Sequence, residues 1–221
     1  PYAVVEFAKN VGITSPLDPV PSICLGTADI SLYEMVGANN TFVNKGTWIE
    51  PTFITRIEDK NGKVLEEFIP KSREVMSEEK AYVMVNLMQG VVDGGTGGRL
   101  RGTYKLMNPI AGKTGTTQNN SDGWFIGMTP DLSAGAWVGG EDRSVHFDLT
   151  EQGQGAAMAL PIWAKFFQKV YADKSLKISK GPFEKPPGRI SMELNCSNFI
   201  EEDGPQFDPS TGPFGEDGTI P

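Results

Sequence analysis

The sequence predicts an α+β fold in which helices pack against an antiparallel sheet. Three observations lead to this prediction. Helical patterns come first, three strand-like segments lie close together within residues 110–139, and another helical pattern follows them. Short turns between successive strands indicate an antiparallel meander, because parallel strands need long crossovers. Helices before and after such a meander are typical of the α+β class.

The first part of the chain is predicted to be mainly helical. Residues 2–12 show a short apolar helical pattern. Ser31 and Glu34 have the spacing of a capping box, which predicts the start of a second helix, and Gly46 is a suitable stop. Apolar residues at helical spacing predict a third helix over residues 78–92. A cluster of glycines accompanies its end, namely Gly90, Gly94, Gly95, Gly97 and Gly98.

The strands are predicted from alternation and turn residues. Residues 52–57 and 64–69 read as a hairpin, because Asn61-Gly62 between them suits a tight turn. The later segments form the meander, and they are residues 110–117, 123–128 and 133–139.

The last helix and the end of the chain differ sharply in composition. The helix is predicted from aromatic and apolar residues at positions i, i+3, i+4 and i+7, namely Trp163, Phe166, Phe167 and Val170. From residue 178 onward there are seven prolines and six glycines among 44 residues. We therefore predict two parts, a folded portion over residues 1–177 and an irregular extension over residues 178–221.

Composition limits the function classes. Lys plus Arg number 20 and Asp plus Glu number 28, giving a net charge of −8. This balance argues against nucleic acid as a partner, since nucleic-acid binders usually present a basic face. One histidine and two cysteines exclude a His-rich or a four-cysteine metal site. No stretch approaches the roughly 20 apolar residues of a membrane span.

The segment of residues 111–117, Ala-Gly-Lys-Thr-Gly-Thr-Thr, is the main candidate for chemistry. A phosphate-binding loop is disfavoured, because Met107 stands where that motif needs glycine and a strand follows where it needs a helix. Small residues that merely permit close packing are a second interpretation. A third is an acyl-transfer site, in which Lys113 supplies positive charge and the threonine hydroxyls bind a carboxylate. Edge-strand backbone groups would then pair with a peptide or stabilise an oxyanion.

The order of motifs resembles the transpeptidase domain of class A penicillin-binding proteins. The resemblance rests on Lys-Thr-Gly-Thr-Thr over residues 113–117, Asp-Gly-Trp-Phe-Ile-Gly-Met-Thr-Pro over 122–130 and Ala-Trp-Val-Gly over 136–139. Leu25-Gly26-Thr27, the Gly95-Thr96-Gly97 segment and residues 155–163 are similar as well. It covers roughly residues 1–170, and it implies the penicillin-binding-protein and serine β-lactamase-like fold.

The resemblance implies a peptidoglycan D,D-transpeptidase that works through a serine acyl-enzyme and is acylated by β-lactams. Its partners would be D-Ala-D-Ala stem peptides, with no metal and no cofactor. By the same resemblance, Lys113 holds the proton network and Thr116 supplies an oxyanion-hole N–H. Substrate binding falls to Thr114, Gly115, Thr116 and Thr117.

The family's other two motifs are not found in their expected places. Ser-x-Asn does not occur, and the only Ser-x-x-Lys is Ser77-Glu78-Glu79-Lys80. Two glutamates oppose an anionic substrate there, so we interpret Ser77 as a helix N-cap. Arg99 and Arg101 precede the site strand and could attract an anionic substrate, but we expect them to be solvated at the surface.

The chain is therefore expected to be half of a catalytic domain that is inactive alone. Its parent would be anchored by an N-terminal helix on the outer side of the cytoplasmic membrane, with a glycosyltransferase domain upstream. An unpaired sheet edge would favour a homo-oligomer. The alternatives are a D,D-carboxypeptidase or β-lactamase-like hydrolase, a non-catalytic cell-wall-binding module, and an NTPase.

Overall fold

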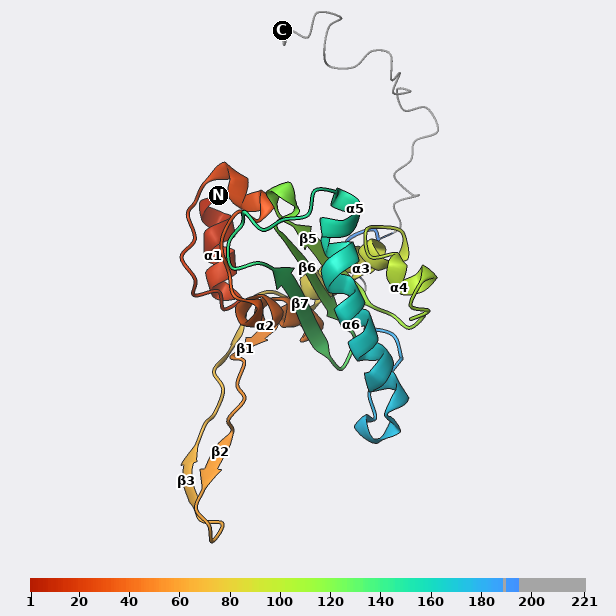
Figure 1. The fold of residues 1–221 in the computed structure, drawn as a ribbon. Coiled ribbons are helices and arrows are strands. Elements are labelled where there is room, and N and C mark those ends of the chain that lie inside the picture. Colours follow the sequence, from red (N-terminus) through yellow and green to blue (C-terminus); the bar gives the residue numbers. More distant parts are fainter. Residues whose placement is uncertain (189, 195–221) are drawn as a thin grey trace, which may run out of the picture. The chain divides into compact units, whose positions relative to one another are not determined.

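A three-stranded antiparallel sheet forms the centre of the structure, a computed structural model that describes residues 1–188 and 190–194. Its strands are β5 (Ala111–Thr116), β6 (Asp122–Met128) and β7 (Ser133–Gly139), arranged in the order β5-β6-β7 (Figure 1). The predicted meander and the α+β class are thereby confirmed, with strand ends within one residue of those expected.

Helices cover both faces of this sheet. Helix α6 (Gly155–Ala172) packs against one face, while α2 (Leu32–Val43) and α3 (Glu78–Asp93) pack against the other (Figure 1). The sheet has two apolar faces for these helices because successive side chains of a strand point to opposite sides. Phe125 of β6 contacts the indole of Trp163 on α6, with ring centroids 5.4 Å apart, whereas Met128 packs with Val85 and Met88 of α3.

Trp163 joins α6 to the sheet by packing and by hydrogen bonds. Its ring is 1% exposed and stacks on Phe167 with centroids 3.9 Å apart. Its Nε1–H donates to the carbonyls of Gly127 and Ala134, at 3.2 and 3.1 Å. Helix α6 begins before Pro161 and continues through it, although proline interrupts the helical hydrogen-bond ladder.

The N-terminal segment wraps onto α2. It contains α1 (Tyr2–Asn10) and the short 3-10 helix η1 (Pro21–Leu25). The predicted capping box is confirmed, because Ser31 accepts from the N–H of Glu34 and the Glu34 carboxylate accepts from the N–H of Ser31. Glu34 also accepts hydrogen bonds from Thr14 and Ser15, so one carboxylate links the incoming chain to the start of α2.

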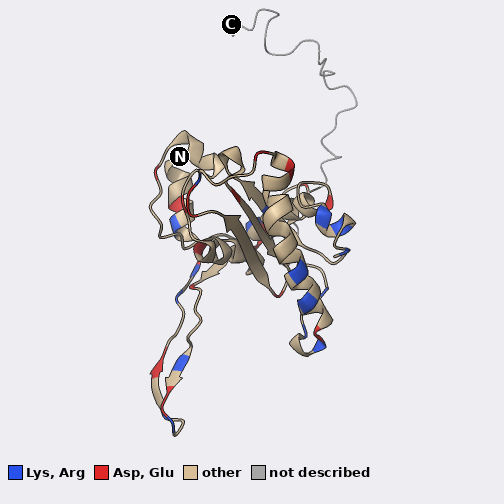
Figure 2. Cartoon of the chain, viewed as in Figure 1, with Lys and Arg blue, Asp and Glu red and all other residues tan. Residues whose placement is uncertain are grey.

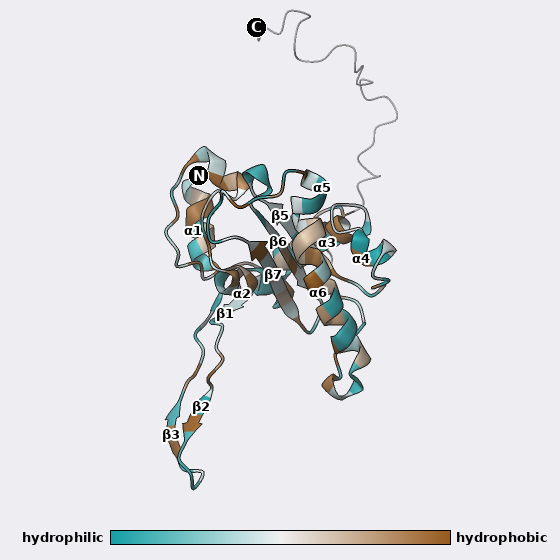
Figure 3. Ribbon diagram, in the orientation of Figure 1, coloured by the Kyte–Doolittle hydropathy of each residue, from teal (hydrophilic) through white to brown (hydrophobic). Residues whose placement is uncertain are grey.

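Two short antiparallel pairs form an arm between α2 and α3. They are β1 (Thr47–Ile49) with β4 (Ser72–Glu74), and β2 (Arg56–Glu58) with β3 (Val64–Glu67). The β2–β3 hairpin extends away from the sheet (Figure 1). Charges of both signs and hydrophobic residues are spread along it (Figures 2 and 3).

The chain divides into two units, Pro1–Gly188 and Arg189–Pro221. Phe183 is buried against the cluster that contains Met88 and Met128, so the packing of the first unit continues past residue 177. Of the extension predicted from residue 178, residues 189 and 195–221 lie outside the described residues.

The remaining short helices are α4 (Arg99–Gly102), η2 (Gln118–Asn120), α5 (Thr150–Gly153) and η3 (Lys174–Leu176). No helix in the described part of the chain is long and apolar enough to cross a membrane.

Candidate active site

The Lys-Thr-Gly segment lies on β5, at one edge of the central sheet. Within residues 1–188 and 190–194, β5 pairs with β6 alone, which leaves its outer edge without a strand. Glycine at position 115 suits this place, because a Cβ there would lie 3.1 Å from the Cβ of Trp124 on β6. The structure thus confirms an edge strand with a small residue at its centre.

Alternation along β5 separates the predicted site residues onto two faces. Thr114 lies opposite Phe125, whose ring contacts α6. Thr116 is two residues further along the strand, so its side chain lies on the same face as that of Thr114. Directly opposite residues of an antiparallel pair share a face, so both threonines lie on the α6 side. Lys113 lies opposite Ile126, on the other side.

The Lys113 ammonium is exposed to solvent and held close to its own strand. Its Nζ donates to the carbonyl oxygen of Thr114 at 2.8 Å. No carboxylate forms an ion pair with Lys113 among the described residues. The cation is therefore available to an anionic ligand at the edge of β5.

Both threonine hydroxyls of the motif have hydrogen-bond partners from distant segments. The Oγ1 atoms of Thr114 and Thr96 lie 2.7 Å apart. The backbone N–H of Gly155, the first residue of α6, donates to Oγ1 of Thr116 at 3.1 Å. Neither partner was predicted to have a role, although Thr96 and Gly155 both belong to segments that carry the family resemblance. Their separations of 18 and 39 residues left no local signal.

Thr117 closes the turn that follows the site strand. Its hydroxyl donates to the carboxylate of Asp122, and its N–H donates to the Asp122 carbonyl at 3.2 Å. These bonds fix where β5 ends, but they also occupy the one hydroxyl hydrogen of Thr117. Thr117 thus lies beside Thr116, where it orders the turn.

Ser77 behaves as a helix cap. Its Oγ accepts from the N–H of Lys80 at 3.4 Å, and the helix that follows begins with Glu78 and Glu79. The N-cap interpretation of the Ser-x-x-Lys pattern is confirmed by this geometry.

The expectation of surface solvation holds for Arg99, which is exposed, but it was wrong for Arg101. Arg101 donates to the Asp93 carboxylate and to the carbonyls of Leu106 and Asn108. Its side chain is 19% exposed. Arg99 donates to the Ala156 carbonyl at 3.3 Å. The two arginines reach these carboxylate and carbonyl acceptors because α4 turns the chain back toward β5.

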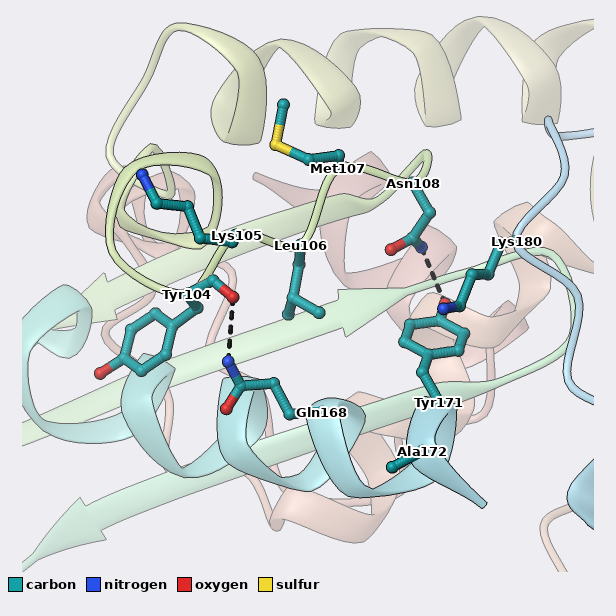
Figure 4. A pocket seen from close by; sticks show the side chains of 9 residues that line it. All are labelled: Tyr104, Lys105, Leu106, Met107, Asn108, Gln168, Tyr171, Ala172 and Lys180. Carbon is teal, nitrogen blue, oxygen red and sulfur yellow. Dashed lines mark hydrogen bonds between the residues drawn. The ribbon is translucent and has the colours of Figure 1, made fainter. Parts of the chain in front are cut away.

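A hollow of about 470 Å³ lies between residues 104–108, which lead into β5, and the last turns of α6 (Figure 4). Asn108 donates to the Tyr171 hydroxyl there, and Gln168 donates to the Tyr104 carbonyl. Gln168 lies 13 residues after Gly155 along α6, which is roughly 20 Å of helix. The hollow is consequently separate from the Lys113 site. Among the described residues, no group of three or more His, Cys, Asp or Glu side chains could hold a metal ion.

Comparison with known proteins gives consistent matches over most of the chain. Residues 20–159 match the family described as penicillin binding protein transpeptidase domain. Penicillin-binding protein 1A of Aquifex aeolicus is 34% identical over 200 residues, which cover 90% of this chain and 26% of that protein. Penicillin-binding protein 2D of Bacillus subtilis is 35% identical over 214 residues, covering 95% and 28%. The chain spans about a quarter of the length of these curated relatives.

Solved structures give the same result for the fold. Penicillin-binding protein 1A from Haemophilus influenzae superimposes with a TM-score of 0.72 at 24% identity, over 83% of this chain and 32% of that chain. PonA1 from Mycobacterium tuberculosis in complex with penicillin V gives a TM-score of 0.66 at 26% identity, over 85% and 53%. Together with the family match, these similarities show that the chain belongs to the transpeptidase domain family of class A penicillin-binding proteins.

Proposed function

We propose that this chain is the Lys-Thr-Gly portion of a peptidoglycan D,D-transpeptidase that acts through a serine acyl-enzyme. The observation that carries the proposal is the edge strand β5, where Lys113 and the hydroxyls of Thr114 and Thr116 flank an open backbone edge. A cation, hydroxyl donors and free backbone groups in one row suit a peptide that ends in a carboxylate. The family match favours transpeptidation over the hydrolase, wall-binding and NTPase alternatives.

Each site residue then has a role. Lys113 attracts the anionic end of the substrate and supports proton transfer near the nucleophile. Thr114 and Thr116 bind the terminal carboxylate, Gly115 permits close approach of the peptide, and Thr117 orders the neighbouring turn. The N–H of Thr116 stabilises the oxyanion that forms as the carbonyl is attacked.

The reaction transfers an acyl group twice. A serine oxygen attacks the carbonyl carbon of the D-Ala-D-Ala bond, and the amine of the terminal D-Ala leaves with a proton. An amine from a neighbouring stem peptide then attacks the ester, forming the cross-link and releasing the serine. A β-lactam acylates the same serine by ring opening, so its amine leaving group stays attached and the enzyme stalls.

We infer that the nucleophile is not among these 221 residues. Ser77 is engaged as a helix cap, and the sequence has no Ser-x-Asn motif. The full-length protein would supply the serine and its lysine, and it would act on the outer side of the cytoplasmic membrane. Stem peptides and β-lactams are its proposed partners.

Acylation of the full-length protein by a fluorescent penicillin tests this function. We expect Lys113→Ala to lower the second-order acylation rate about 100-fold, the scale of losing a preorganised electrostatic group. Lys60→Ala, on the exposed turn between β2 and β3, is the matched control and should label like the wild type. The isolated 221-residue chain should show no covalent mass increase with penicillin. Equal labelling of the two lysine variants would contradict the proposed role of Lys113.

A further inference from the structure

We propose that Thr96 and Gly155 are positioning residues that leave the hydroxyl hydrogens of Thr114 and Thr116 free for a substrate carboxylate. The inference rests on the proposed function and extends it to residues outside the Lys-Thr-Gly motif. Thr96 lies between α3 and α4, and Gly155 begins α6. Both reach β5 from the side of the threonine hydroxyls.

The hydrogen-bonding capacity of a threonine hydroxyl is limited. It has one hydrogen to donate and two lone pairs that accept, whereas an ionised carboxylate only accepts. A threonine that donates to another protein group has no hydrogen left for the carboxylate. Its usefulness as a ligand therefore depends on whether its partner in the protein is a donor or an acceptor.

At Thr116 the partner can only donate. The group that contacts Oγ1 is the backbone N–H of Gly155, at 3.1 Å. A backbone N–H has no lone pair, so Thr116 accepts this bond and keeps its own hydrogen. The N–H also belongs to the first turn of an 18-residue helix, whose positive dipole end favours an anion close by.

At Thr114 the partner is a second hydroxyl. The two Oγ1 atoms lie 2.7 Å apart, and either of them can be the donor. A bound carboxylate selects the arrangement in which Thr96 donates to Thr114 and Thr114 donates outward. Charge-assisted hydrogen bonds are stronger than neutral ones, which gives this arrangement its advantage.

The glycine cluster explains how Thr96 reaches the strand. After α3 the chain turns back over its last turn, and the N–H of Gly97 donates to the Val91 carbonyl at 2.8 Å. A Cβ at Gly95 would lie 2.9 Å from that carbonyl oxygen, and one at Gly97 would lie 3.1 Å from it. Glycine on both sides of Thr96 thus permits the tight turn that presents its hydroxyl to Thr114.

The test compares two ligands that differ at one group, a charged carboxylate in one and its neutral methyl ester in the other. The full-length protein is acylated with benzylpenicillin, which has a free carboxylate, and with the neutral methyl ester of the same compound. The quantity measured is the acylation rate with benzylpenicillin divided by the rate with its methyl ester. We expect Thr96→Val to reduce this ratio about fivefold to tenfold, because the isosteric valine side chain cannot donate a hydrogen bond to Thr114. Thr96→Ser should restore the ratio, and Thr103→Val, an exposed threonine in the same segment, should leave it unchanged.

The outcomes separate three cases. A smaller ratio in Thr96→Val that serine restores supports positioning of Thr114. Equal slowing with both compounds, or no change in either rate, overturns the inference, because a purely structural effect does not sense ligand charge. A wild-type protein that neither compound acylates contradicts the proposed function itself, and the inference falls with it.

Discussion

Gly155 at the start of α6 lies directly against the backbone of Gly115 on the site strand. A Cβ placed on Gly155 would lie 2.3 Å from the Gly115 carbonyl oxygen and 2.4 Å from that of Trp124. Neither obstacle is a flexible side chain, so the helix and the sheet would have to separate. The absence of a side chain at position 155 therefore sets how closely α6 approaches β5.

We predict that Gly155→Ala destabilises the 221-residue chain by about 1–3 kcal/mol, the usual cost of overpacking. The matched control is Gly90→Ala, because Gly90 lies within α3 with open space where its Cβ would be. That substitution should stabilise the chain by about 0.5–1 kcal/mol through helix propensity. Urea unfolding of both variants measures the difference. An equal effect of the two substitutions would contradict the close contact.

Ser77→Ala should affect stability and leave acylation unchanged. Loss of the cap on α3 is expected to cost about 1 kcal/mol, and Ser77→Asp should recover most of it. Unfolding of the chain and penicillin labelling of the full-length protein measure the two properties separately. Loss of labelling in Ser77→Ala, with stability intact, would show that Ser77 is a nucleophile after all.

The stabilising effect of the Glu34 carboxylate should be lost in acid, so the chain is predicted to be less stable there. Partial burial raises the pKa of Glu34, but hydrogen bonds from Ser15, Thr14 and Ser31 outweigh it and hold the pKa well below its usual value. A carboxyl with a lowered folded-state pKa stabilises the fold above its unfolded value of about 4.3, and this stabilisation is lost as the pH falls further.

Glu34→Gln is accordingly expected to lower the free energy of unfolding at pH 7 by about 1–2 kcal/mol, allowing for solvent screening. The difference from the wild type should shrink as the pH falls below about 4. Urea titrations between pH 3 and pH 7 measure it, with Glu6→Gln on the exposed side of α1 as control. A difference that does not change with pH would rule out the charged form of Glu34 as the cause.

The isolated chain is predicted to self-associate through β7. In the part of the chain that the structure describes, β7 pairs only with β6, so its outer edge has no strand. A groove of about 750 Å³ borders that edge, lined by Leu32 and Val36 of α2 and by Gly135 of β7. Unpaired edges favour strand addition. Sedimentation velocity at increasing concentration should show dimers, and a monomer throughout would exclude this.

Local patterns in the sequence predicted the elements that local interactions determine. The capping box of Ser31 and Glu34 and the meander both match the structure. The hairpin ladder is shorter than predicted and runs only over Arg56–Glu58 and Val64–Glu67. Phe53 and Ile69 lie outside it and, like the paired residues, they are exposed, so no packing against the core extends the ladder. Strands β1 and β4 were missed, since three residues give too little alternation to detect.

The candidate site was predictable only along its own strand. Lys113 to Thr117 were identified as one run of residues, of which β5 holds Lys113 to Thr116 and Thr117 begins the turn that follows. The hydroxyl of Thr96 and the N–H of Gly155 reach this strand through the glycine turn and the start of α6. Contacts of that kind depend on how elements pack, and no periodicity or spacing in one sequence specifies them.

The alternation of β5 has a consequence for the direction of ligand approach. Lys113 extends from one face of the strand, and Thr114 and Thr116 extend from the other. A single carboxylate that contacts both kinds of side chain cannot lie above either face, so it must lie beyond the rim, in the plane of the sheet. A peptide that approaches from this side would pair with the free outer edge of β5 and add a strand to the sheet.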